Sequence, residues 1–505
     1  MELLKETGRP GINREYVYDA LNRIVEVKIG GEAVERYRYT ERGREVIYTD
    51  GEGGSFSYNK NVYGELTTET NRLNDSQRYS YDTEGRIISN TAYSGKQTKV
   101  EYRDSEGITI TTYSDGTQDI IERDKTGNII RITGSTGTIR YRYDAGGMLV
   151  EQNDEGAGEI TRYAYNKAGQ RSRMASGNRD VQYYYGKNGE LVYIRDTGQR
   201  LEVHYEYDSR GRETRRVYGN GVKQETLYDR IGRVILIKET DLQNRLIRVE
   251  GYLYDEQGRR SHSVDEEGRV TKYIYNSKSQ LSTVLYPWTT EKASADKKEA
   301  EEAGLYFTPE KGLGQRYMYS AAEVAPLREL LNRAFPGLGN AVSQSQMVWL
   351  ETYTYDRNGN RATKTTPWGT IRYDYDAENR LIRKGDVVYT NDKDGNILTE
   401  RGLRYEASYE YNGQNRMAYS EVTSHVDRTH TVTWYAYDAL GRRTLTESVT
   451  GQTMRTLYDG RSFEAIREGE TFLNGSLTTR YAAGGATANG VMQSLIRRQG
   501  RDTGG

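Results

Sequence analysis

Apolar and polar residues alternate with a period of two along most of the chain, and short polar turns interrupt the alternation. Residues 23–29 read RIVEVKI and residues 233–239 read RVILIKE, so aliphatic and β-branched side chains recur at alternate positions. A period of two places successive side chains on opposite faces of a strand, and β-branched residues suit a pleated backbone. The pattern predicts an all-β chain of short strands joined by tight turns.

One turn motif, Tyr-x-Tyr-Asp-x-x-Gly-Arg, recurs through the chain. Weaker copies fill the gaps, and neighbouring copies are spaced by about 21 residues, the length of one hairpin. The two tyrosines share one strand face, and the aspartate starts a turn by binding its own backbone. Gly suits the left-handed position three residues later, and Asn is the next most tolerant residue there. The eight good copies begin at Tyr16, Tyr79, Tyr141, Tyr205, Tyr252, Tyr353, Tyr373 and Tyr435.

The predicted site residues are structural residues of these turns, and the sequence predicts no catalytic, cofactor-binding or metal-binding residue. They are Tyr18, Asp19, Asn22, Tyr81, Asp82, Gly85, Tyr143, Asp144, Tyr207, Asp208, Gly211, Tyr254, Asp255, Gly258, Tyr355, Asp356, Gly359, Tyr375, Asp376, Asn379, Tyr437, Asp438 and Gly441.

Hairpins in series are expected to pair edge to edge into one long antiparallel sheet, which must coil because strands twist. The fold class predicted is therefore all-β, with tandem hairpin repeats forming a spiralling sheet, as a hollow shell or a solenoid, and a small helical insertion. The chain has 45 tyrosines and 5 phenylalanines, and tyrosines alternate with charged residues. That composition favours a wall that is wet on both faces around a wide interior.

The repeat lapses between Tyr286 and Trp349. Residues 291–304 are highly charged and predict an exposed helix or a flexible linker. Residues 320–337 predict a helix with a capping box at Ser320 and Glu323, either kinked at Pro326 or beginning there. On one interpretation, the apolar face of this helix is a plug or a docking surface. On the other interpretation, which is the more common case, it is an ordinary face packed on the outer wall. That face consists of Leu327, Leu330, Leu331, Ala334 and Phe335.

Four segments follow from these patterns. Residues 1–285 and 351–481 are expected to be β-shell, residues 286–350 the insertion with helical segments, and residues 482–505 a glycine-rich tail.

Charge and composition exclude several function classes. Lys and Arg number 72 against 73 Asp and Glu, so no net field attracts nucleic acid or anionic lipid. The chain has no cysteine, which excludes disulfides and thiolate chemistry. The sequence shows no transmembrane segment and no signal peptide, which predicts a soluble chain without a recognisable export signal.

Candidate chemistry is sparse. The chain has four histidines, and only the HVDRTH stretch, with His425, Asp427 and His430, brings possible metal ligands near one another. On a strand, His430 would face away from the other two, which argues against a metal site. The turns lack the successive oxygen ligands of calcium loops, and no carboxylate pair has a distinctive context. We therefore expect no enzyme activity and no cofactor. The remaining histidines are His204 and His262.

The repeat motif resembles the YD repeats of Rhs proteins, wall-associated protein A, the B and C components of toxin complexes, and teneurins, over nearly the whole chain. Residues 456–469 (TLYDGRSFEAIREG) and 477–481 (LTTRY) are similar to the start of the Rhs-associated core. The resemblance implies a secreted or surface β-shell that encloses a C-terminal toxin, often a nuclease, deaminase or ADP-ribosylating domain.

The sequence departs from that family at its end, because the Asp-Pro and Gly-Leu segment of the core is absent and no protease aspartate can be carried over. The expectation is a non-catalytic container without its cargo. Its expected partners are the missing toxin or another Rhs segment, secretion-apparatus proteins or cell-surface glycans, with no nucleic acid and no membrane insertion. The alternative is an extracellular adhesin or carbohydrate-binding surface protein.

Overall fold

The computed structural model describes residues 3–6, 14–198, 200–305, 314–461, 465–471 and 477–481. The predicted tail at residues 482–505 lies outside the described residues, as do parts of the core-like segments. Two compact units are present. Unit 1 comprises residues 1–78, 206–395 and 400–405, and unit 2 comprises residues 79–205, 396–399 and 406–505.

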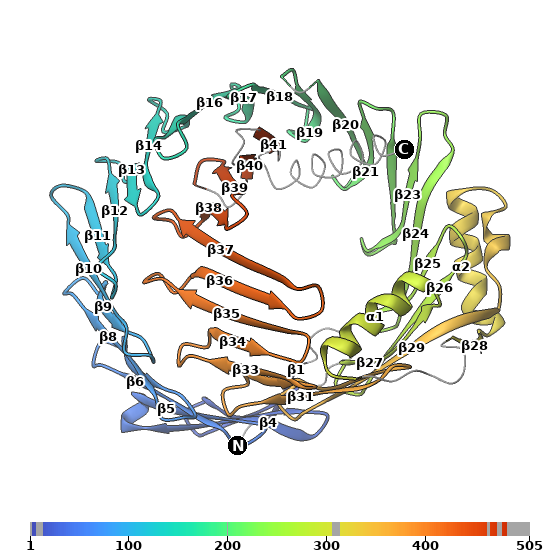
Figure 1. The fold of residues 1–505 in the computed structure, drawn as a ribbon, viewed down its shortest axis with the longest axis horizontal. Coiled ribbons are helices and arrows are strands. Elements are labelled where there is room, and N and C mark those ends of the chain that lie inside the picture. Colours follow the sequence, from blue (N-terminus) through green and yellow to red (C-terminus); the bar gives the residue numbers. More distant parts are fainter. Residues whose placement is uncertain are drawn as a thin grey trace. The chain divides into compact units, whose positions relative to one another are not determined.

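Strands make up nearly all of the regular structure (Figure 1). In the first half of the chain they are β1 (Leu3–Glu6), β2 (Arg14–Tyr18), β3 (Ile24–Ile29), β4 (Glu32–Thr40), β5 (Glu45–Asp50), β6 (Ser55–Lys60), β7 (Leu66–Thr70), β8 (Ser76–Tyr81), β9 (Ile87–Thr91), β10 (Gln97–Arg103), β11 (Ile108–Thr112), β12 (Gln118–Arg123), β13 (Ile129–Gly134), β14 (Gly137–Tyr143), β15 (Leu149–Asp154), β16 (Glu159–Tyr165), β17 (Arg171–Ser176), β18 (Arg179–Tyr185), β19 (Leu191–Asp196) and β20 (Leu201–Tyr207).

The second half adds further strands and the helices. The strands are β21 (Glu213–Tyr218), β22 (Lys223–Tyr228), β23 (Val234–Thr240), β24 (Leu246–Tyr254), β25 (Arg260–Asp265), β26 (Val270–Tyr275), β27 (Leu281–Pro287), β28 (Gln315–Met318), β29 (Ser345–Tyr355), β30 (Arg361–Thr366), β31 (Gly369–Tyr375), β32 (Leu381–Lys384), β33 (Val387–Asn391), β34 (Ile397–Arg401), β35 (Tyr405–Tyr411), β36 (Met417–Ser424), β37 (Thr429–Tyr437), β38 (Arg443–Ser448), β39 (Thr453–Tyr458), β40 (Ala465–Thr471) and β41 (Leu477–Tyr481). The α-helices are α1 (Thr290–Glu302) and α2 (Ala321–Ala334), and the 3-10 turns are η1 (Glu41–Gly43) and η2 (Leu338–Ala341).

Consecutive strands pair antiparallel, as the hairpin repeats predict. The pairing runs from β1 to β8 in unit 1 and from β10 to β19 in unit 2, and it resumes in the later strands. A register shift recurs just before the second tyrosine of the motif, for example between Val17 and Tyr18 and between Ala436 and Tyr437. The shift is the β-bulge expected beside a turn that closes with a left-handed residue. The prediction of an all-β chain of tandem hairpins with a small helical insertion is confirmed.

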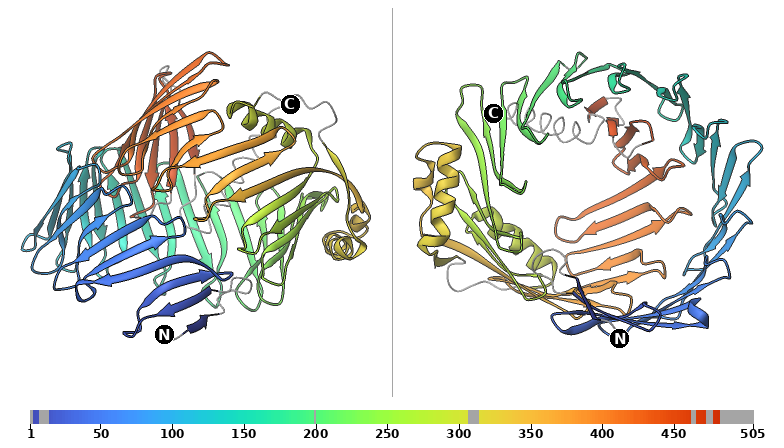
Figure 2. Two further views of the ribbon diagram at one scale, coloured as in Figure 1. Left: turned by 90° about the horizontal axis from the view of Figure 1, so that it is seen from below. Right: turned by 180° about the vertical axis from the view of Figure 1, so that it is seen from behind.

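The two helices lie on opposite faces of the β26–β29 part of unit 1 (Figures 1 and 2). Strand β27 pairs directly with β29, so the insertion leaves the sheet and the chain returns beside the strand it left. Val348 packs in the cluster beneath α2, whereas Glu351 binds a lysine of α1. Residues an odd number of positions apart on a strand point to opposite faces, so the contacts of Val348 and Glu351 place α2 and α1 on opposite faces of the sheet.

Helix α2 packs on the sheet through its predicted apolar face. Leu327 and Leu331 are fully buried with Leu236 and Val249 of the neighbouring strands. Ser320 and Glu323 form the predicted capping box, and Pro326 lies inside the helix, which begins before it. Phe335 is 43% exposed, so its inclusion in the buried face was wrong. It is the C-cap residue with an extended backbone, and it has left the helical periodicity.

Of the two expectations for residues 291–304, the helix is present, but the expectation that it is exposed was wrong for one of its faces. Helix α1 has an N-cap at Thr289, and its residues Ala293, Asp296 and Ala300 are buried against the sheet. The sequence of α1 is too polar to predict apolar packing. Charged groups hold this helix on the sheet instead.

Both faces of the sheet were expected to be wet, and this is wrong for part of unit 2. Strands β14, β16 and β18 alternate buried and exposed residues along their length. Tyr141, Tyr163 and Tyr183, the first tyrosines of their motifs, are each at most 7% exposed. We call the strand face that carries the motif tyrosines the tyrosine face.

Candidate functional site

Each predicted turn closes around its aspartate. At the first copy, Oδ1 of Asp19 accepts hydrogen bonds from the backbone N–H groups of Leu21 (2.9 Å) and Arg23 (3.0 Å). The N–H of Asn22 donates to the carbonyl of Asp19 (3.0 Å), and Asn22 has a φ of 57°. The side chain thus ties down the backbone of the turn, and the left-handed residue closes it.

The other predicted turn residues take the same positions. Asp82, Asp144, Asp208, Asp376 and Asp438 each accept from the N–H groups two and four residues later. Asp255 and Asp356 accept from the N–H four residues later. The left-handed residues are Gly85, Gly211, Gly258, Gly359, Asn379 and Gly441. The strands β2, β8, β14, β20, β24, β29, β31 and β37 end at Tyr18, Tyr81, Tyr143, Tyr207, Tyr254, Tyr355, Tyr375 and Tyr437.

The arginine that ends the motif links one repeat to the next. Nε of Arg233 donates to Oδ2 of Asp229 (2.6 Å), and its guanidinium carbon lies 4.3 Å from the ring centroid of Tyr254 in the following repeat. The hydroxyl of Tyr254 donates back to the carbonyl of Val234 (2.6 Å). Stacking and hydrogen bonding together join the two repeats, and we call this arrangement the Arg–Tyr staple.

The staple recurs in both units. The complete set of contacts is formed by Arg23 with Tyr39, Arg86 with Tyr102, Arg212 with Tyr228, Arg233 with Tyr254, Arg259 with Tyr275 and Arg442 with Tyr458. In the first, the hydrogen bond from Arg23 is the main cause that lowers the pKa of Asp19 below its usual value. The arginine was visible in the sequence motif, but its role was missed because its tyrosine belongs to the next copy.

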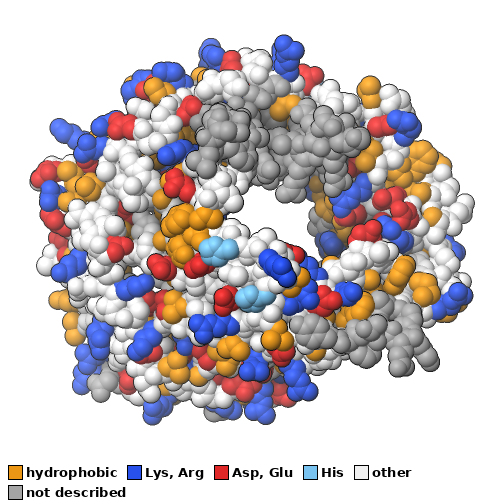
Figure 3. All heavy atoms as spheres, in the orientation of Figure 1, with side chains coloured by type: hydrophobic (Ala, Val, Ile, Leu, Met, Phe, Trp, Pro, Cys, Tyr) orange, Lys and Arg blue, Asp and Glu red, His pale blue; other side chains and the backbone are white. Residues whose placement is uncertain are grey.

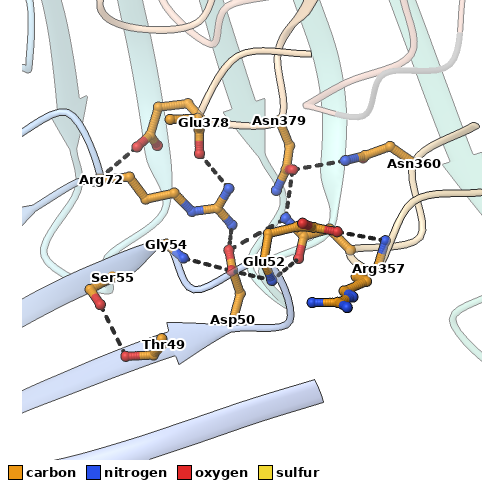
Figure 4. Close-up of polar contacts among 12 residues, drawn as sticks. Thr49, Asp50, Glu52, Gly54, Ser55, Arg72, Arg357, Asn360, Glu378 and Asn379 are labelled. Atoms are coloured by element: carbon orange, nitrogen blue, oxygen red, sulfur yellow. Dashed lines mark hydrogen bonds and ion pairs between the residues drawn. The ribbon is translucent and has the colours of Figure 1, made fainter. Parts of the chain in front are cut away.

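In unit 1, turns of early repeats bind turns of late repeats around Asp50 (Figure 4). Arg72 forms a buried ion pair with Asp50, and its backbone N–H donates to Oε1 of Glu378 (2.6 Å). The N–H of Glu52 donates to Oδ1 of Asn358 (3.2 Å). We call this contact between residues 50–54 and 71–75 and residues 357–360 and 377–379 the Asp50 seam. Of the predicted turn residues, Asn379 enters it, through side-chain contacts with Asn358 and Asn360.

Unit 2 has a corresponding contact around Gly460. The N–H of Gly460 donates to the hydroxyl of Tyr163 (3.1 Å), and Arg171 forms an ion pair with Asp459. The side-chain amide of Gln152 donates to the carbonyl of Tyr458 (3.0 Å). We call the contact of residues 458–460 with β14–β17 the Gly460 seam. Burial against this segment is the main cause that raises the pKa of Tyr163 well above its usual value.

The two seams follow one rule. In each seam a late YD turn contacts a much earlier segment, which consists of turns in the Asp50 seam and of strands β14–β17 in the Gly460 seam. The bonded residues lie between 288 positions apart, for Arg171 with Asp459, and 319 positions apart, for Tyr141 with Gly460.

Outside the two seams, the carbonyl of Tyr437 accepts a similar long-range hydrogen bond from the hydroxyl of Ser135 (3.1 Å). Asp438 supports the Gly460 seam through Arg442, which also donates to the Gly460 carbonyl (2.8 Å). The other predicted turn residues are distributed over separate turns.

Charged groups hold α1 on the tyrosine face of unit 1. Nζ of Lys364 lies 3.1 Å from Oδ1 of Asp296 and 2.7 Å from Oε2 of Glu299, and Lys384 binds the other Glu299 oxygen at 2.9 Å. Burial raises the pKa of Glu299, but the hydrogen bonds from Lys364 and Lys384 outweigh it and bring the pKa to about 2. This cluster has the appearance of a catalytic centre, yet every carboxylate in it faces a lysine, which is the arrangement of a structural anchor.

The histidines form no ligand set. His425 and His430 are exposed near the β36–β37 connection, and Nε2 of His430 lies 2.8 Å from Oε1 of Glu421. His262 is buried beside Glu323 of α2, and His204 stacks on Tyr193. Within the described part of the chain, no three His, Cys, Asp or Glu side chains are grouped so that they could hold a metal ion.

None of the α-helices in the described ranges is both long and apolar enough to span a bilayer.

Comparisons with known proteins agree with the repeat architecture. The Teneurin YD-shell family model matches residues 130–297 and 331–462, more than half of the chain. The solved structure of TcdB2-TccC3-TEV has a TM-score of 0.62 and 14% identity over 94% of this chain, and that of TcdB2-TccC3 has a TM-score of 0.61 at the same identity and coverage. This chain spans only 27% of each of those chains.

No curated protein matches this sequence. The family model nevertheless covers both units and both sides of the insertion, and it confirms the resemblance seen in the repeat motif. The chain belongs to the Teneurin YD-shell family.

Proposed function

We propose that this chain is a non-catalytic scaffold, a length of shell wall from a secreted or surface toxin whose cargo is a separate C-terminal toxin segment. The proposal rests on family membership and on the way the repeats are joined. Each Arg–Tyr staple fixes one hairpin to the next, and the two seams lock turns that are about 300 residues apart. A wall that encloses a polypeptide needs both kinds of contact, because a gap between repeats or between turns would release the cargo.

The surface supports a scaffold that binds no nucleic acid. On the face drawn in Figure 3, Lys and Arg side chains are interspersed with Asp and Glu, without a large patch of one sign. Nucleic-acid binding would require a basic surface that neutralises several phosphates. The clusters of buried charge described above are paired within themselves, which favours a structural role over catalysis.

Small-angle scattering on the purified chain tests the container role. The expected pair-distance distribution is that of a particle with mass depleted at its centre. A solid globule or a rod would overturn the proposal.

Protease protection provides a second test with cargo present. A small folded reporter carrying a protease site is fused after residue 481, and the fusion is treated with the cognate protease. The expected result is protection of the site, compared with rapid cleavage of the free reporter. Equal cleavage of both would contradict enclosure, and binding to cell-surface glycans in a parallel array would then favour the adhesin alternative.

A further inference from the structure

Three copies of a Glu-x-Tyr-x-Tyr pattern occur in unit 1, and all lie on its tyrosine face. In each copy the tyrosine two residues after the glutamate donates its hydroxyl to the carboxylate. The pairs are Glu35 with Tyr37, Glu250 with Tyr252, and Glu351 with Tyr353. Because a carboxylate accepts several hydrogen bonds, each pair has capacity left for a further donor.

In two of the three pairs, a lysine or arginine of the chain itself binds the glutamate. Helix α1 delivers Lys292, which forms an ion pair with Glu351 and lies 4.4 Å from the ring centroid of Tyr286. A carboxylate and a tyrosine ring together thus hold a lysine ammonium group. At the second pair, Arg248 forms an ion pair with Glu250. The guanidinium of Arg260 stacks over Tyr252 at 4.0 Å.

The third pair is open. Within the part of the chain that the structure describes, Glu35 accepts from Tyr37 (2.7 Å), and no Lys, Arg or His lies within ion-pair distance of its carboxylate. The ring centroids of Tyr37 and Tyr48 are 5.3 Å apart. Together with Tyr58 these rings line a pocket of about 540 Å³, which Val46, Leu66 and Lys60 complete. The pocket therefore offers the same kinds of group that hold Lys292 elsewhere, and within the described residues its carboxylate has no ion-pair partner.

We propose that this pocket, defined by Glu35, Tyr37, Tyr48 and Tyr58, binds the ammonium group of a lysine side chain from a partner polypeptide. Cation–π contact with the tyrosine rings and an ion pair with the carboxylate supply the binding energy. The apolar residues Val46 and Leu66 suit the aliphatic stem of a lysine. Lys60 also lines the pocket but is exposed, so solvent screens its charge. Its repulsion grows with the charge of the ligand, which favours a single lysine ammonium over a polyamine. The site does not depend on the proposed container role.

Saturation-transfer NMR on the full chain tests the site with defined probes. The first probe is Nα-acetyl-lysine amide, and its matched control is the same molecule with the side-chain amine acetylated. The expected result is a signal from the aliphatic stem of the charged probe only, and a loss of affinity of at least ~10-fold in Glu35→Gln. Glu106→Gln, an exposed change in unit 2, should bind like the parent chain.

Variants of the ring wall separate cation binding from misfolding. Tyr58→Phe keeps the aromatic face and should retain binding, whereas Tyr58→Leu should weaken it while circular dichroism and the unfolding midpoint stay near those of Tyr58→Phe. Equal binding of the acetylated probe, or full binding by Glu35→Gln, would overturn an ammonium site. Tighter binding of spermidine than of the lysine probe would overturn the choice of a lysine side chain.

Discussion

Nε of Arg442 donates a 2.7 Å hydrogen bond to Oδ2 of Asp438, and the two side chains form an ion pair inside a turn where they are almost completely shielded from solvent. The Arg442 side chain is 0% exposed and that of Asp438 is 3% exposed. Nη1 of Arg442 also donates to the carbonyl of Gly460 (2.8 Å). In other copies, the same Asp–Arg pair closes a turn that is exposed to solvent. In this copy the pair supports the Gly460 seam, so we expect its burial to increase its contribution to stability.

We expect Asp438→Ala to lower the free energy of unfolding by roughly 3–5 kcal/mol, because it leaves a buried guanidinium without its carboxylate. The matched control is Asp241→Ala, which removes the same bond from a turn where the Arg245 side chain is 77% exposed. Its effect should be much smaller, since water replaces the lost partner. Urea unfolding of both variants measures the difference, and equal losses would contradict the role assigned to burial.

The Asp50 seam should depend on Arg72. Arg72→Ala strips a buried partner from Asp50, whose side chain is 5% exposed, and we expect a loss of roughly 3 kcal/mol in unit 1. Hydrogen exchange should speed up at residues 71–75 and 356–360 together. Arg78→Ala, on the exposed side of β8, is the control and should leave both segments unchanged. Faster exchange confined to residues 71–75 would show that the two sides of the Asp50 seam do not stabilise each other.

The Arg–Tyr staple can be tested with a single hydroxyl. Tyr254→Phe keeps the ring under Arg233 but removes the 2.6 Å bond to the Val234 carbonyl, and the expected cost is about 1 kcal/mol. Tyr63 is 86% exposed in a turn, so Tyr63→Phe should not change the unfolding midpoint. If the two variants have the same unfolding midpoint, the hydrogen bond of the Arg–Tyr staple contributes nothing to the free energy of unfolding.

We expect low pH to weaken the packing of helix α1 on the sheet. The pKa of Glu299 is lowered to about 2 by Lys364 and Lys384, below its ordinary value of 4.5. Because the unfolded chain binds this proton more readily, the stabilisation is complete above about pH 4.5 and is lost as the pH falls toward 2. Urea unfolding of the parent chain and of Glu299→Gln should differ at pH 5, and the difference should shrink steadily as the pH falls toward 2. A constant difference would exclude Glu299 as the titrating anchor.

The insertion shows the limits of sequence patterns. The apolar periodicity of residues 327–334 predicted both the α2 helix and its buried face, because hydrophobic burial follows the helical period. Helix α1 has no such stripe, and its burial depends on Lys364 and Lys384, which follow it by more than 60 residues. The sequence contains both charges but no local sign that they meet.

The sequence by itself determined the hairpins, since the aspartate, the left-handed residue and the strand-ending tyrosine act within five positions of one another. Local hydrogen bonds need no distant partner, so residues such as Asp19 and Asn22 could be assigned from the motif alone. Only the tertiary structure decided which copies are buried, which turns meet at the seams, and which Glu-x-Tyr pair stays open. Those outcomes depend on contacts between residues up to about 300 positions apart, and identical local motifs carry no information about which distant segment will cover them.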